Sequence, residues 1–160
     1  MKTLGPATRK VTGGVIAALC LVVFSGCDYE VPITSSPTRK IDDRLLGDWV
    51  SMDGKDRMKV RKLDDFIYVC SFNGDLLQAF HSDVGQTPFI SAQNIESAER
   101  KYMYLTYTIS ADGERLVIRP VNTKIIPVET KDSATVQRLL KDNLQNPALF
   151  VEEGEFTKEK

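Results

Sequence analysis

The chain has 160 residues, and its formal net charge is −1 because 21 lysines and arginines stand against 22 aspartates and glutamates. This balance excludes the strongly basic composition that favours nucleic acid, and we expect no nucleic-acid partner. A single histidine argues against a conventional zinc site, and we expect no metal and no other cofactor. The length fits one globular domain.

The first 26 residues have the parts of a secretory signal peptide. Three basic residues precede an apolar run over residues 15–24, and the small residues Ser25 and Gly26 follow it. A helix over this run rises about 15 Å, half of the roughly 30 Å hydrocarbon core of a membrane. The run is therefore too short to span a bilayer, and we expect residues 1–26 to be cleaved.

Cys27 directly follows these two small residues, and this ending resembles the lipobox of bacterial lipoproteins. Phe24 departs from that pattern, in which Leu is usual. The resemblance implies that Cys27 is diacylated, becomes the new N-terminus and anchors the protein in a membrane, facing the periplasm. Asp28 resembles the signal that retains lipoproteins in the inner membrane of enteric bacteria. Where that sorting rule does not apply, we expect the outer membrane.

Residues 27–40 are predicted to form the lipidated cysteine and an extended linker, because two prolines and several small polar residues follow Cys27. Fully stretched, such a linker reaches about 40 Å and would let the domain stand off the bilayer. Cleavage leaves 18 basic and 22 acidic residues, and lipidation leaves Cys70 as the one free thiol. No intramolecular disulfide can then form, so the domain must be stabilised by its core.

Turn dipeptides organise the domain predicted over residues 41–160. Three of them lie between alternating apolar and polar runs, a pattern typical of two-residue β-hairpins: Asp53-Gly54, Asn73-Gly74 and Asp112-Gly113. Three hairpins predict an all-β domain, an antiparallel meander that closes or nearly closes into a barrel. A β-sandwich is the alternative.

Further elements are predicted closer to the C-terminus. Asp132 or Ser133 can cap an amphipathic helix over about residues 133–145, which we expect to pack on the sheet rather than on a membrane. Further strands are expected over residues 89–93, 101–109, 115–119, 121–126 and 148–156.

The hairpins also predict which residues share a face of the sheet, since a two-residue turn sets the cross-strand pairs. Trp49 falls opposite Met58, and Ile67 opposite Phe80. If Asp64-Asp65 is also a two-residue turn, Val60 falls opposite Val69. The predicted core, which would line any cavity, comprises Trp49, Met58, Val60, Ile67, Val69, Leu76 and Phe80.

The opposite face of the same strands combines cationic and aromatic side chains. Arg57, Lys59 and Arg61 alternate along one strand, and the assumed register places Tyr68 beside Arg61. One interpretation is an ordinary outer face whose rings are covered by cationic stems. The other is a surface that binds an anionic partner, a lipid headgroup or an envelope protein.

Gly47 and Trp49 open the first predicted strand after a short helical turn, and this Gly-x-Trp motif resembles the first strand of lipocalins and related calycins. The resemblance implies a barrel closed at one end by Trp49, with an interior that holds a small apolar or amphipathic ligand. Three features depart from that family. That family commonly has an Arg near the last strand that packs over the Trp, and this sequence has only Lys158 in that neighbourhood. The usual disulfide is absent, and one further strand follows the helix.

Catalytic residues are not indicated by any motif. Under the predicted register Cys70 and His81 lie four residues apart along the strands, about 13 Å, which is too far for a Cys-His pair. We therefore expect no enzyme and keep two hypotheses. The first is a lipid-anchored module that binds a small apolar ligand, and the second is a structural lipoprotein that engages an envelope protein through Arg57, Lys59, Arg61 and Tyr68.

Overall fold

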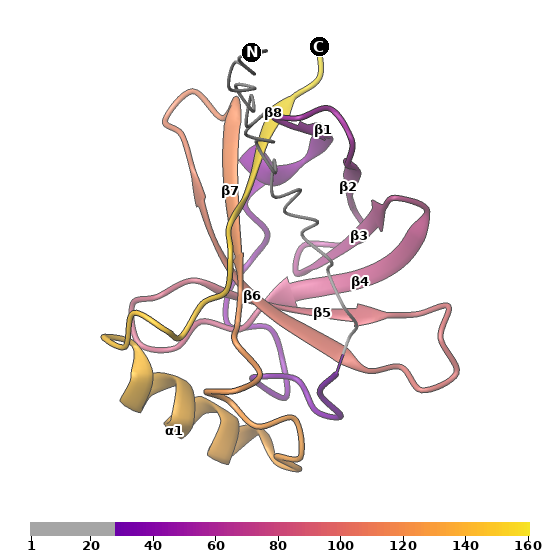
Figure 1. The fold of residues 1–160 in the computed structure, drawn as a ribbon. Helices are drawn as coiled ribbons and strands as arrows, with labels where there is room; N and C mark the ends of the chain where they lie inside the picture. The colour runs from indigo at the N-terminus through magenta and orange to yellow at the C-terminus, as the bar shows by residue number, and fades with distance from the viewer. Residues whose placement is uncertain (1–27) are drawn as a thin grey trace, which may run out of the picture.

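The computed structural model describes residues 28–160, and the predicted signal peptide and Cys27 lie outside the described residues. Eight antiparallel strands follow one another around a closed barrel, and the last strand pairs with the first (Figure 1). The predicted all-β meander barrel is thus confirmed. No helix within residues 28–160 has the length and apolar character needed to cross a membrane.

The elements follow in chain order as η1 (Asp43–Leu45), β1 (Gly47–Ser51), β2 (Arg57–Lys62), β3 (Ile67–Phe72), β4 (Asp75–His81), β5 (Phe89–Asn94), β6 (Tyr102–Ile109), β7 (Arg115–Pro120), α1 (Ser133–Asn143) and β8 (Gly154–Lys158).

The three predicted hairpins form with the predicted pairs. Trp49 lies opposite Met58, Ile67 opposite Phe80, and Tyr107 opposite Ile118. In the tightest turn Asn73 and Gly74 both have positive φ, 49° and 106°, as a two-residue turn of the primed type requires.

The connection between β2 and β3 differs from the prediction. Asp64 and Asp65 do not form a two-residue turn, because residues 63–66 all lie in the loop and the Asp64 carboxylate accepts hydrogen bonds from the backbone amides of Phe66 and Ile67. Val60 therefore pairs with Cys70 and not with Val69. This shift of one residue turns the other face of β3 toward the barrel interior.

Four of the seven predicted core residues consequently lie on the outer face. Cys70 pairs with Leu77, and Tyr68 with Ala79, on the inside, so Ile67, Val69, Leu76 and Phe80 alternate to the outside. Phe80 is buried on that outer face, as predicted for a core residue, whereas the other three are not fully buried. Trp49, Met58 and Val60 belong to the core as predicted. The buried core of the barrel comprises Leu45, Trp49, Met58, Val60, Tyr68, Ala79, Ile90, Ala92, Tyr107, Leu116, Ile118 and Phe156.

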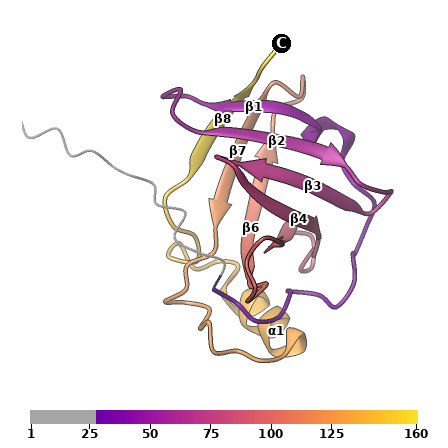
Figure 2. The same ribbon diagram turned by 90° about the vertical axis from the view of Figure 1, so that its right-hand side faces the viewer.

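A second core lies outside the barrel and includes the segment that was predicted as a free linker. Tyr29 is buried and stacks on Tyr104 with ring centroids 3.8 Å apart, and Ile33 is fully buried. Figure 2 shows this segment, in indigo, passing beside α1. The expectation of a tether that stands off a bilayer is therefore wrong for these residues, because their apolar side chains cover the outer face of the sheet.

The helix packs against the same core, as predicted, through Val136 and Leu140. Asp132 caps it by accepting a hydrogen bond from the Thr135 amide at 2.8 Å. The prediction of strands over 121–126 and 148–156 is wrong in detail. The first segment makes a single bridge at Val121 and then turns, and the last strand starts only at residue 154.

Candidate functional site

The barrel interior contains an apolar cavity of about 80 Å³. Its wall is built by inward side chains from every strand between β2 and β7, and Leu45 of η1 completes it. Met58 and Val60 were predicted to line it and do so. The other lining residues were not predicted and come mainly from β4 to β7. The sequence predicts cross-strand pairs within each hairpin there, but not the pairs between one hairpin and its neighbour.

Two paired alanines account for the open space. Ala79 of β4 lies opposite Ala92 of β5, and both are buried and face the cavity. Tyr68 and Leu77, which also line the cavity, are much larger. Protein interiors pack at a density of about 0.75, so two adjacent methyl side chains leave a volume that leucines would fill.

The size of the cavity limits what it can hold. Pockets for drug-sized ligands measure roughly 300–1,000 Å³, and a dry cavity of about 150 Å³ is enough for benzene. A cavity of about 80 Å³ suits a smaller apolar group, or a benzene-sized one after modest side-chain movement.

Trp49 and Lys158 together close one part of the barrel. The fully buried Trp49 ring donates from Nε1 to the Leu45 carbonyl at 2.9 Å. Lys158 lies over that ring, with Nζ 4.9 Å from its centroid, and donates to the Arg44 carbonyl at 2.8 Å. Gly47 has φ +139°, and a Cβ there would lie 3.2 Å from Lys158 Cε. Both the positive φ and this close contact favour glycine, which explains why the Gly-x-Trp motif has glycine at position 47.

No protein-family model, no curated protein and no solved structure matches this chain. The likeness to lipocalins therefore stays a resemblance in the Gly-x-Trp motif and the meander barrel.

A polar cluster lies at one end of the cavity and was not predicted. Tyr68 and Tyr107 line the cavity, and the centroid of the His81 ring lies 5.6 Å and 6.0 Å from theirs. Arg39, from the segment before η1, bonds Asp83 at 3.0 Å and donates to the Tyr107 hydroxyl at 3.1 Å. Arg39 lay in the predicted linker, where no pattern distinguished it from its neighbours.

Burial controls the protonation of this cluster. His81 is fully buried, and burial together with the positive charge of Arg39 lowers its pKa from 6.5 to about 4. The imidazole is therefore neutral at pH 7. Burial raises the pKa of the Asp83 carboxyl, although the charge of Arg39 opposes this.

The inventory of reactive groups is small within the described residues. Burial raises the pKa of the Cys70 thiol to about 12, so thiolate is scarce at neutral pH and this sulfur is a poor nucleophile. Residues 28–160 contain no group of three or more histidine, cysteine or acidic side chains that could hold a metal ion.

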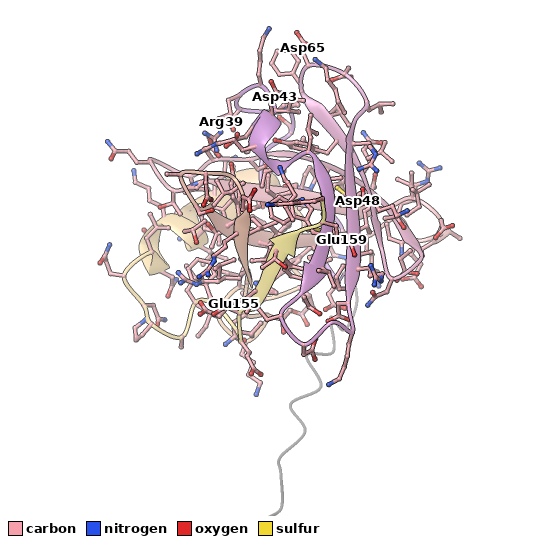
Figure 3. The ribbon with its side chains drawn as sticks, turned by 90° about the horizontal axis from the view of Figure 1, so that it is seen from above. Arg39, Asp43, Asp48, Asp65, Glu155 and Glu159 are labelled. Atoms are coloured by element: carbon pink, nitrogen blue, oxygen red, sulfur yellow. The ribbon has the colours of Figure 1, made fainter. Side chains whose placement is uncertain are left out.

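The predicted basic and aromatic surface is not assembled as expected. Tyr68 lies in the barrel interior, 2% exposed, because of the shift in β3. Arg57 and Arg61 are exposed but form ion pairs with Glu159 and Asp48, which lie side by side on this face (Figure 3). Much of the positive charge on this surface is therefore neutralised within the chain.

Proposed function

We propose that this chain is an envelope lipoprotein, anchored through Cys27, whose barrel binds a small apolar molecule. The observation that carries the binding function is the apolar cavity beside the Ala79 and Ala92 pair. A well-packed core would place larger side chains there. The lipobox-like sequence before Asp28 supports the anchor.

The cavity wall indicates the class of ligand and its affinity. The wall is apolar apart from the hydroxyls of Tyr68 and Tyr107, which already have partners, so a neutral apolar molecule fits it. Each buried CH₂ group contributes about 0.8 kcal/mol, and about six of them give a dissociation constant in the submillimolar range. A weak, reversible ligand is therefore expected.

The start of the barrel domain constrains how an anchor would work. The backbone amides of Asp28 and Tyr29 both donate to the Tyr102 carbonyl at 3.0 Å, and Tyr102 donates back to Tyr29 at 2.7 Å. A lipid on Cys27 would thus be joined to a residue already fixed on β6. The barrel would then lie directly against the bilayer, in the inner membrane if the Asp28 sorting signal operates.

The binding function can be tested by filling the cavity. An Ala92→Leu variant of residues 28–160 should lose the benzene-induced NMR shifts of cavity methyl groups such as those of Val60 and Ile118. Ala134→Leu makes the same change on the exposed side of α1 and should keep them. Equal shifts in the Ala92→Leu variant would refute the proposal. Native mass spectrometry of the purified domain, before and after organic extraction, identifies a natural ligand.

A further inference from the structure

The segment between residues 38 and 42 is bound to the barrel end by a set of polar contacts around His81. The Thr38 amide donates to the His81 carbonyl at 2.9 Å, and its hydroxyl accepts from the Asp83 amide at 2.9 Å. Arg39 binds Asp83 through Oδ2, and the Asp42 amide donates to the Tyr68 hydroxyl at 2.5 Å. Strand β4 and this segment thus share one polar cluster.

These contacts determine which nitrogen of His81 carries its proton. The Tyr68 hydroxyl accepts from Asp42, so its own hydrogen is free to donate to His81 Nε2, 2.9 Å away. Nε2 of the neutral ring is then the acceptor, and Nδ1 carries the N–H. His81 therefore presents a hydrogen-bond donor on the side of the ring that faces Asp83.

Two buried polar atoms face each other without a hydrogen-bond partner among residues 28–160. These are His81 Nδ1 and Asp83 Oδ1, and the two atoms lie 3.9 Å apart. That distance is too long for a direct hydrogen bond. An unpaired buried donor or acceptor costs about 1–3 kcal/mol. This cost falls on both atoms, while Asp83 Oδ2 is paired with Arg39, and the Thr38 side chain and the Phe89 amide also act on the Asp83 carboxyl.

We propose that His81 and Asp83 form a binding site for one hydroxyl group, which accepts from His81 Nδ1 and donates to Asp83 Oδ1. An oxygen at about 2.8 Å from both atoms satisfies both bonds, since they are close enough to share it. A carbonyl or an ether has no hydrogen to donate to Asp83 Oδ1. A carboxylate is repelled by the negative charge of the Asp83 carboxylate. An ammonium group cannot accept from His81.

Two sources of this hydroxyl share the same chemistry: a water molecule, and the hydroxyl of a small alcohol whose apolar part lies in the barrel cavity. The second source rests on the proposed function. Tyr68 and Tyr107 line the cavity and lie beside the His81 ring, which does not line it, so we expect the alcohol to reach the site only when one of these two rings turns aside.

Benzene and phenol test the site, because they are similar in size and differ by one hydroxyl. In a purely apolar cavity phenol binds more weakly than benzene, since its hydroxyl loses water without compensation. If the hydroxyl reaches His81 and Asp83, phenol binds about tenfold more tightly than benzene. Asp83→Asn should abolish this preference. Asp65→Asn removes the same charge from an exposed ion pair and should preserve it.

A crystal structure of the domain without added ligand separates the two sources. An ordered oxygen bonded to both His81 and Asp83, with benzene favoured over phenol, assigns the site to water. Phenol favoured over benzene, with its oxygen at that position, assigns it to an alcohol. An ordered oxygen with neither probe bound supports the site and refutes the proposed function. Absence of an ordered oxygen together with absence of a phenol preference overturns the inference.

Discussion

Acidification should destabilise the barrel through His81. Burial first, and then the charge of Arg39, lower the His81 pKa from 6.5 to about 4 in the folded protein. Between those two values the unfolded chain binds a proton that the folded protein does not bind. Stability therefore falls as the pH falls through this window. Each pKa unit corresponds to about 1.4 kcal/mol, so the loss between pH 7 and pH 4 is about 3 kcal/mol.

Asp83 acts in the opposite direction and must be separated from this effect. Burial raises its pKa, so the folded protein takes up that proton more readily than the unfolded chain, and this contribution grows as the pH falls. Arg39 and Asp42 also face His81, with charges that oppose each other in their effect on its pKa. The pH dependence of the wild-type free energy of unfolding is therefore the sum of contributions from several titrating groups.

Comparison with a His81→Gln variant isolates the histidine. Glutamine can still accept from Tyr68, but it does not titrate in this range. Urea unfolding at pH 7, 6, 5 and 4 gives the free energy of unfolding for both proteins. The difference between them should change by about 3 kcal/mol in favour of the variant as the pH falls. Parallel profiles for the two proteins would refute the assigned role of His81.

Three further changes test separate parts of the structure. Asp132→Ala removes the cap of α1 and should cost about 1 kcal/mol in the free energy of unfolding, measured with urea; no loss would mean that this hydrogen bond contributes nothing. Ile33→Ala creates a cavity where the N-terminal segment is fully buried and should cost about 2–5 kcal/mol by the same assay, whereas a free linker would show no change. Cys27→Ala should abolish incorporation of labelled palmitate and recovery in the membrane fraction, and retention of both would contradict the anchor.

The hairpins show where sequence patterns suffice and where they fail. Asn-Gly and Asp-Gly turns have strong local preferences, so the pairs around them could be predicted. The Asp64-Asp65 pair has no such preference. The Asp64 carboxylate instead accepts hydrogen bonds from the backbone amides of Phe66 and Ile67 and so stabilises a longer loop. Because side chains alternate with a period of two, this single error exchanged the two faces of β3 and, through the correctly predicted pairs between them, of β4.

The candidate site was less predictable than the fold. Ala79 and Ala92 form the open space by being small, and a small inward residue gives no hydrophobic signal of its own. The polar cluster brings Arg39 to Asp83 across 44 positions of the chain, from a segment without any periodic pattern. Such contacts depend on tertiary packing, which local propensities do not encode.

The course of residues 28–42 along the barrel has a mechanical consequence. Their contacts follow one another in chain order, from Tyr29 on β6, through Ile33 at Ser91 of β5, to Asp42 at Tyr68 of β3. A pulling force on the N-terminus would load the Tyr29 contacts first and those at the barrel end last. If Cys27 is lipidated as proposed, tension on that anchor would break the Tyr29 contacts before those near the cavity.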